Sequence, residues 1–108
     1  MFMRHEDSEL KDLGGGSTRR ILAWNEQLMS VEVAFETGAE GKAHSHPHIQ
    51  CSYVVSGRFR YTVNDDTAEL GPGDSVVVPS GAVHGTVCVE GPGVLLDVFT
   101  PMREDFLA

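Results

Sequence analysis

The stretch Ala43-His44-Ser45-His46-Pro47-His48-Ile49-Gln50 contains three of the five histidines of the chain. Residues two apart on a β-strand point to the same face, so we expect His44 and His46 to present two imidazoles on one side of the chain. Gln50 continues the same phase, although Pro47 can interrupt a strand and its phase. The spacing places the two imidazoles close enough to share a metal ion.

A fourth candidate ligand, His84, lies in the separate stretch Pro79-Ser80-Gly81-Ala82-Val83-His84, and only folding can bring it to the others. A lone histidine is more often a surface or hydrogen-bonded core residue than a ligand, and that is the alternative here. Three histidines and an amide in two turn-flanked motifs favour one divalent transition metal, either zinc, nickel, manganese or iron. The predicted ligands are His44, His46, Gln50 and His84.

Short runs rich in Val, Ile, Tyr and Phe alternate with turn residues from position 19 onward. This pattern is typical of an all-β sandwich or barrel, and we find no amphipathic stripe with a 3.6-residue period. A two-layer barrel is an economical way to bury many short strands. The expected strands are 21–24, 28–36, 43–46, 50–56, 58–63, 74–78, 85–89 and 94–100.

The two histidine motifs resemble those of the cupin superfamily. The first cupin motif is a Gly, five residues, His-x-His, three or four residues, Glu, six residues and a Gly; the second is a Gly, five residues, Pro-x-Gly, two residues, His, three residues and an Asn. Both spacings hold here, in Gly38, His44, His46, Gln50 and Gly57, and in Gly73, Pro79, Gly81, His84 and Cys88. The resemblance implies a double-stranded β-helix, a jelly-roll-like barrel.

Two positions depart from the cupin pattern, because Gln50 stands where Glu is usual and Cys88 where Asn is usual. The usual Asn is not a metal ligand, so the change at Cys88 matters little to the chemistry. A neutral glutamine leaves the full charge of a divalent ion on the site, which suits the polarisation of substrate oxygens. It also lowers the expectation of oxygen chemistry at iron.

The chain of 108 residues fits one domain. Residues 1–18 are polar and end in Gly14-Gly15-Gly16-Ser17, so we expect an N-terminal arm with a flexible joint. A single cupin barrel domain is then expected over residues 19–108. The two cysteines, Cys51 and Cys88, are expected to be small buried residues that form no disulfide.

The run Val94-Leu95-Leu96-Asp97-Val98-Phe99-Thr100 is an apolar strand that contains one carboxylate. Alternation places Leu95, Asp97 and Phe99 on one face. If that face lines the barrel cavity, Asp97 is a candidate general acid or base. The alternative is an edge strand on which Asp97 faces water.

Arg103 follows this run, in Thr100-Pro101-Met102-Arg103-Glu104-Asp105. The guanidinium of arginine is a preferred partner for a carboxylate, so Arg103 is a candidate for binding an acidic substrate. The alternative is a surface arginine that pairs with Glu104 or Asp105, which contributes little free energy.

Segments 44–50, 54–60, 69–75 and 97–107 resemble the KdgF family of pectin-degradation proteins, and the resemblance covers most of residues 28–107. The family's metal ligands are His, His, Gln and His, so Gln50 agrees with it. The resemblance implies catalytic roles for Asp97, Phe99 and Arg103. It also implies a metal-dependent enzyme that converts 4,5-unsaturated uronate monosaccharides from pectin or alginate to linear 4-deoxy-5-keto-uronates. His48 shares the strand phase of His44 and His46, so a fourth imidazole near the site is one interpretation. We favour a role for His48 in supporting the ligands or in the loop.

The net charge of -8 argues against binding to nucleic acid or to an anionic membrane surface. A small anionic sugar substrate is compatible with this charge if local positive groups hold it. No apolar segment resembles a membrane span or a secretory signal, so we expect a cytoplasmic protein. Exposed strand edges favour a homodimer.

Two other functions remain open from the sequence. An iron-dependent dioxygenase acting on a small organic acid would use the same barrel, with three histidines on Fe(II). A non-catalytic sugar-acid binding cupin would use the same cavity without turnover. Oxygen consumption distinguishes the first alternative, and binding without turnover distinguishes the second.

Overall fold

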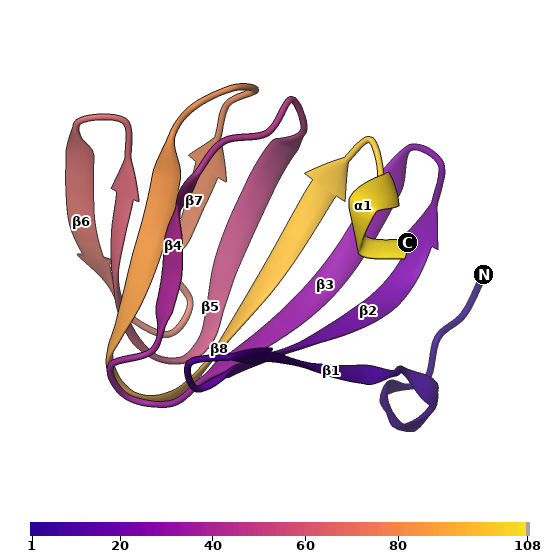
Figure 1. Ribbon diagram of the computed structural model, residues 1–108, viewed down its shortest axis with the longest axis horizontal. Coiled ribbons are helices and arrows are strands. Elements are labelled where there is room, and N and C mark those ends of the chain that lie inside the picture. The colour runs from indigo at the N-terminus through magenta and orange to yellow at the C-terminus, as the bar shows by residue number, and fades with distance from the viewer. Residues whose placement is uncertain (108) are drawn as a thin grey trace.

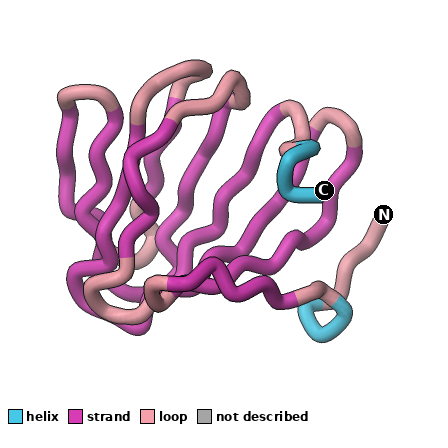
Figure 2. The backbone as a smooth tube through the Cα atoms, viewed as in Figure 1, coloured by secondary structure: helices cyan, strands magenta, loops and turns pink. Residues whose placement is uncertain are grey.

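The computed structural model describes residues 1–107 of the chain, which form one extended set of antiparallel strands with two very short helical segments (Figure 2). The strands are β1 Leu10–Gly14, β2 Ser17–Asn25, β3 Leu28–Phe35, β4 Glu40–His44, β5 Ile49–Val63, β6 Asp66–Leu70, β7 Ser75–Val78 and β8 His84–Thr100. The helical segments are η1 His5–Asp7 and α1 Glu104–Leu107. The prediction of an all-β fold is confirmed.

The strands pair in the order β1-β2-β3-β8-β5-β6, with β4 added on β8 and β7 on β5. The two long strands β5 and β8 pair with each other from Ile49 opposite Thr100 to Val63 opposite His84. Figure 1 shows the sheet curving round, with β4 and β7 on one side, β2 and β3 on the other, and α1 beside the ends of β2, β3 and β8. The shared strands β5 and β8 therefore connect both halves of the barrel.

Both long strands bend where the sequence predicted turns. We expected separate strands on either side of Gly57 and of residues 90–93, but each pair is one strand whose ladder shifts register at these points. Gly57 has a φ of 79°, and a Cβ there would lie 2.7 Å from the Cα of Gly93. A glycine inside a strand is compatible with either a turn or a bend, and here the pairing of β5 with β8 continues past it.

The bend also changes which side chains face inward on β5. Before it, Gln50, Ser52 and Val54 are buried, whereas after it Phe59 and Tyr61 are buried. A shift of one residue in a strand turns every later side chain to the opposite face. The core is formed by the inward side chains of β3, β5, β7 and β8 together with two loop residues: Met29, Val31, Val33, Phe35, Ala39, Val54, Phe59, Tyr61, Val78, Ala82, Cys88, Leu95 and Phe99.

Other boundaries differ from the expected ones. The predicted arm at residues 1–18 contains β1, which pairs with β2 across the glycine run, so this part of the arm lies on the sheet. The polar strand β6 was missed because it is an edge strand with exposed side chains and no apolar alternation.

Strand β4 ends at His44, so His46 lies in the following loop and the same-face argument does not apply to it. Cys51 is exposed, whereas Cys88 is buried, and both are free thiols.

We predict that Gly57→Ala destabilises the protein by about 3 kcal/mol, because it combines an unfavourable positive φ with a backbone clash at the bend. Gly15→Ala is the matched control, because Gly15 has a φ of 63° and no atom within 4 Å of the added methyl group. The control should lose only about 1 kcal/mol. Denaturant unfolding measures both, and equal losses would contradict the close approach at the bend.

Candidate metal centre and active site

The three predicted histidine ligands come together at one end of the barrel. His44 ends β4, His84 begins β8 and is its cross-strand partner, and His46 lies in the loop before β5. The ring centroids are 4.4 Å apart for His44 and His84, 4.8 Å for His46 and His84, and 5.5 Å for His44 and His46. One ring nitrogen from each lies within 4.8 Å of the other two. Histidines from two distant motifs therefore meet in a cluster of metal-binding size.

The backbone sets the tautomer of each histidine. Nδ1 of His44 lies 2.8 Å from the carbonyl oxygen of Lys42, and Nδ1 of His84 lies 3.0 Å from that of Ala82. Nδ1 of His46 lies 3.0 Å from the carbonyl oxygen of His48. A carbonyl oxygen only accepts, so each Nδ1 carries the proton, and in the neutral imidazole Nε2 keeps a lone pair. This arrangement is typical of metal-binding histidines, whose second nitrogen is held by a hydrogen bond.

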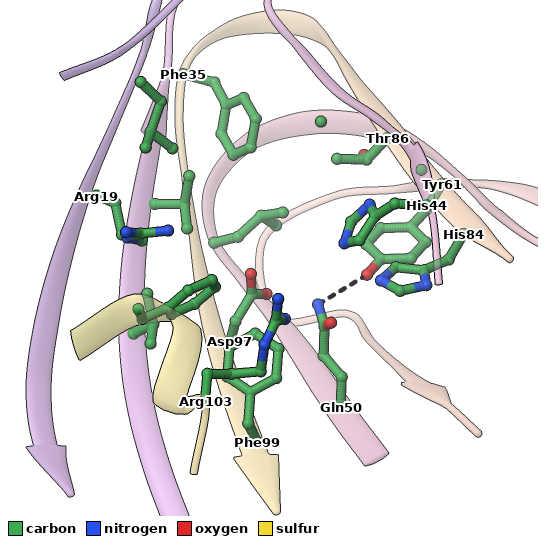
Figure 3. Close-up of a pocket in the computed structure, with 17 residues that line it drawn as sticks. Arg19, Phe35, His44, Gln50, Tyr61, His84, Thr86, Asp97, Phe99 and Arg103 are labelled. Atoms are coloured by element: carbon green, nitrogen blue, oxygen red, sulfur yellow. Dashed lines mark hydrogen bonds between the residues drawn. The ribbon is translucent and has the colours of Figure 1, made fainter. Parts of the chain in front are cut away.

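Gln50 adds a fourth donor atom to the cluster. Its Oε1 lies 2.9 Å from Nε2 of His46. Its Nε2 donates to the hydroxyl oxygen of Tyr61 at 3.3 Å (Figure 3) and to that of Ser52 at 3.0 Å, which fixes the orientation of the amide. Two lone pairs, one on the amide oxygen and one on the neutral imidazole of His46, therefore face each other at hydrogen-bond distance. A cation between them would turn this repulsion into attraction.

Burial keeps the two inner histidines ready to bind a metal. Desolvation by burial is the main cause that lowers the pKa of both His46 and His84, so both favour the neutral imidazole. Nε2 of His84 is buried and has no hydrogen-bond partner within residues 1–107. Such orphaned polar atoms are rare in native proteins, and a role as a metal ligand is one explanation. Three imidazoles and an amide oxygen are suitable ligands for a divalent transition metal.

His48 supports this centre through its backbone, since its carbonyl oxygen accepts the bond from His46. Its ring lies 5.5 Å from that of His46 but is not one of the three that converge.

Asp97 lies inside the barrel and only 9% of it is exposed. Its position opposite Ser52 in the β5–β8 ladder explains why the Ser52 hydroxyl donates to its Oδ1 at 2.6 Å. Burial raises the pKa of Asp97 to about 6, and the hydrogen bond from Ser52 opposes this shift. The edge-strand alternative for Asp97 does not apply, because β8 lies between β3 and β5.

A chain of hydrogen bonds links Asp97 to the metal-binding cluster. The hydroxyl groups of Ser52 and Tyr61 are 2.9 Å apart, and Gln50 donates to both. Burial, and then the charge of Asp97, raise the pKa of Tyr61, so its phenol stays neutral. The sequence analysis did not identify Ser52 or Tyr61. Alternation from Gln50 would have placed Ser52 on the same inward face. It would have placed Tyr61 on the outer face, because the register shift at Gly57 is not visible in the sequence.

The C-terminal segment forms the other wall of the cavity. Arg103 is 8% exposed, and its Nε and Nη2 donate to the two carboxylate oxygens of Asp105 at 3.0 and 2.8 Å. The predicted pairing with Asp105 therefore exists, but the arginine is buried instead of lying on the surface. Its guanidinium carbon lies 5.1 Å from the ring centroid of Phe99 and 4.2 Å from that of Phe106.

One cavity of about 140 Å³ is lined by His44, Gln50, Tyr61, His84, Asp97, Phe99 and Arg103. His46 and Ser52 do not line it, but they are hydrogen-bonded to Gln50 and Asp97, which do. His44, Gln50 and His84 lie on one side of it and Arg19 on the other, with Asp97, Phe99 and Arg103 between them (Figure 3). Arg19 and Phe106 are lining residues that the sequence analysis missed, because nothing in their local sequence distinguishes them. A small polar molecule in this cavity would contact the histidine cluster, a carboxyl group and a guanidinium together.

A bent antiparallel barrel with converging histidines from two motifs is the architecture of a metal cupin, and a family model described as the cupin domain matches residues 31–99. The chain belongs to the cupin superfamily, and within it to the KdgF-like proteins. It is 37% identical over 103 residues to the pectin degradation protein KdgF of Dickeya dadantii strain 3937, and the match covers 94% of each chain.

Solved structures agree with this assignment. KdgF from Halomonas sp. superposes with a TM-score of 0.93 at 36% identity, over 98% of this chain and 97% of that one. An RmlC-like cupin from Shewanella frigidimarina NCIMB 400 superposes with a TM-score of 0.92 at 47% identity, over 97% and 94% of the two chains. The predicted resemblance to cupins and to KdgF is confirmed.

A more distant relative bears on the metal. Oxalate decarboxylase of Bacillus subtilis, in a structure concerned with its Mn(II) centres, superposes with a TM-score of 0.83 at 26% identity. The match covers 93% of this chain but only 29% of that longer one. The three-histidine cluster and this metal-containing neighbour support a divalent metal, and the enzymes among the relatives support an enzymatic role.

Within residues 1–107 no helix is long and apolar enough to cross a membrane. The cytoplasmic location stays a prediction.

We predict that His46→Ala and His84→Ala each reduce the metal content of the purified protein at least tenfold, because each removes one ligand nitrogen. His5→Ala is the matched control, since His5 is exposed and pairs with Glu32 away from the cavity. Elemental analysis after dialysis against limiting zinc measures the content. Full metal occupancy in the two cavity variants would exclude this cluster as the binding site.

We also predict a pH-dependent effect of Asp97→Asn on the metal-free protein. The pKa of Asp97 is about 6 in the folded protein against an ordinary value of 3.8. Between these values the folded state keeps a proton that the unfolded state has lost, so the stability due to Asp97 falls as the pH rises. The free energy of unfolding of the parent relative to the variant should fall by about 2 kcal/mol from pH 4 to 6. Urea titrations measure it, and a constant difference would contradict the raised pKa.

Proposed function

We propose that this protein converts 4,5-unsaturated uronate monosaccharides, released by the cleavage of pectin or alginate, into linear 4-deoxy-5-keto-uronates. The main supporting observation is that one cavity combines a buried carboxyl group of raised pKa, a histidine cluster suited to a metal and a buried arginine. The similarity to KdgF, a pectin degradation protein, supports the same substrate class. We propose His44, His46, Gln50 and His84 as the metal ligands.

The proposed conversion is an isomerisation without any change of oxidation state. The ring bond between C1 and O5 breaks, and the hydroxyl on C1 loses its proton to become the aldehyde. The alkene between C4 and C5 becomes a ketone at C5, and one proton adds to C4. Because the same number of protons leaves and returns, a single carboxyl group can accept one and give it back.

Asp97 is suited to this role. A carboxyl group with a pKa of about 6 is mostly ionised at neutral pH, yet it binds a proton more readily than an ordinary aspartate. The Ser52 hydroxyl holds one of its oxygens at 2.6 Å, which limits rotation of the carboxylate. Asp97 would therefore take the proton from the C1 hydroxyl and return it to C4.

The remaining residues would bind and orient the sugar. Phe99 is buried beside Asp97 and offers a flat surface against which a sugar ring can pack and exclude water. Arg103 supplies positive charge to this cavity in an acidic protein. A divalent metal, when bound, would polarise the sugar oxygens placed against it.

We predict that Asp97→Asn lowers kcat for unsaturated galacturonate by about 100-fold or more, while leaving metal content unchanged. Asparagine keeps the size of the side chain and can accept the bond from Ser52, but it cannot take a proton. The loss of ultraviolet absorbance of the conjugated alkene measures turnover. The uncatalysed ring opening is subtracted in a protein-free sample.

Asp65→Asn is the matched control, because Asp65 is exposed in the turn between β5 and β6. Equal turnover by the parent and Asp97→Asn would remove the proposed role of Asp97. The reaction should also proceed without oxygen; turnover that requires oxygen and iron would favour the dioxygenase. Tight binding of uronates with no turnover in any metal-loaded sample would favour a binding protein.

We also propose that the protein is a homodimer that pairs through an outer apolar face on β5 and β7, comprising Ile49, Cys51, Tyr53, Val55 and Val77. All five side chains are exposed and none is charged, and Cys51 lies opposite Val77 in the ladder. An uncharged apolar surface on a chain of charge -8 suits a contact with a second copy, because like charges elsewhere would repel.

We predict that Val77→Lys converts the dimer to a monomer, because each of the two copies would then bury one lysine charge in the contact. Ala68→Lys on the exposed edge strand β6 adds the same charge away from this face and should leave the dimer intact. Light scattering after size-exclusion chromatography measures the mass. A monomeric parent, or a dimeric Val77→Lys variant, would refute this interface.

A further inference from the structure

We propose that Arg19 is the residue that binds the substrate carboxylate and selects acidic over neutral sugars, an inference that rests on the proposed function. Arg19 lies on β2, far in sequence from every residue discussed above as catalytic, and it lines the same cavity as Asp97 and Arg103. Figure 3 shows its side chain entering the cavity from the wall opposite His44 and His84.

Arg19 and Arg103 share one aromatic ring. The guanidinium carbon of Arg19 lies 3.8 Å from the ring centroid of Phe106, and that of Arg103 lies 4.2 Å from it. The ring attracts both cations, which offsets part of the repulsion between their like charges. Two guanidinium groups at one end of a small cavity form a local positive region in a protein of net charge -8.

The two arginines differ in their hydrogen bonds. Nε and Nη2 of Arg103 are both occupied by Asp105, which already fills one edge of that guanidinium. Nε of Arg19 is buried and has no acceptor within residues 1–107. A buried N–H group without an acceptor is costly, and a bound anion is one way to satisfy it.

The charge of Arg19 is also incompletely balanced. Burial, and then the positive charge of Arg103, lower its pKa, whereas the more weakly acting Asp105 raises it. A carboxylate bound at Arg19 would supply both the missing acceptor and the missing countercharge. Arg103, positioned by Asp105, would support this binding electrostatically. The sugar carboxylate would then lie at the Arg19 end of the cavity and the ring oxygens toward the histidines.

The competing explanation is that Arg19 only holds Phe106 and α1 in place. Binding of an unreactive acid separates the two roles. We would measure the affinity of zinc-loaded protein for galacturonate and for its uncharged methyl ester by calorimetry, with the parent, Arg19→Gln, Arg19→Lys and Arg60→Gln. Arg60 is exposed on β5, so Arg60→Gln removes the same charge outside this cavity.

The parent should bind galacturonate at least tenfold more tightly than the ester, and Arg19→Gln should abolish most of that preference. Arg19→Lys should retain part of it because the charge remains, and Arg60→Gln should retain all of it. A purely structural role would weaken acid and ester equally and lower the unfolding midpoint. Equal weakening of acid and ester binding would overturn the proposal. So would an Arg19→Gln variant that keeps the preference for the acid, or a parent protein that shows no such preference.

Turnover provides a separate measurement. If the parent opens unsaturated galacturonate, Arg19→Gln should raise KM at least tenfold and change kcat much less, since Asp97 and the histidines are untouched. If the parent turns over no uronate, the proposed reaction fails, while the binding preference still decides whether Arg19 selects carboxylates.

Discussion

The antiparallel pairing of β5 with β8 is the interaction on which the rest of the structure depends. At one end it sets Ser52 opposite Asp97 and Gln50 opposite Phe99, and at the other it sets Val63 opposite His84. A slip of one residue would turn these side chains to the outer face. Both strands bend near Gly57, so residues from both sides of the bend line the same cavity: Gln50 and Tyr61 on β5, and His84 and Asp97 on β8. The site therefore requires this register and this bend together.

The same pairing creates an unusual polar interior. Asp97, Ser52, Tyr61 and Gln50 are buried beside Leu95 and Phe99, where unpaired polar groups are expensive. Most of their donors and acceptors are satisfied by one another, but the network ends at two facing lone pairs on Gln50 and His46. A cation would complete the network, so metal binding and the stability of this part of the core are expected to be coupled.

The net charge of the whole chain and the local charge at the cavity have opposite signs. The chain is acidic as a whole, which opposes the approach of an acidic sugar from a distance. At the cavity, Arg19 and Arg103 stack on Phe106 and provide local positive charge. The short segment before and within α1 contributes Arg103, Asp105 and Phe106. Selectivity for an acid would thus arise from contacts inside the cavity and not from the long-range field.

The sequence by itself determined the fold class, the family and the residues of the histidine cluster, because turn residues, apolar alternation and motif spacing are local properties. It could not show that β5 and β8 are continuous strands, since a glycine is found both in turns and at bends within a strand. Only the pairing of β5 with β8 on both sides of Gly57 shows that the strand continues there. For the same reason the phase of Tyr61, and its contact with Ser52, were hidden. The prediction that His44 and His46 share a strand face failed because β4 ends at His44. Arg19 reaches the cavity only through tertiary structure, which packs it on Phe106 from the far end of the chain.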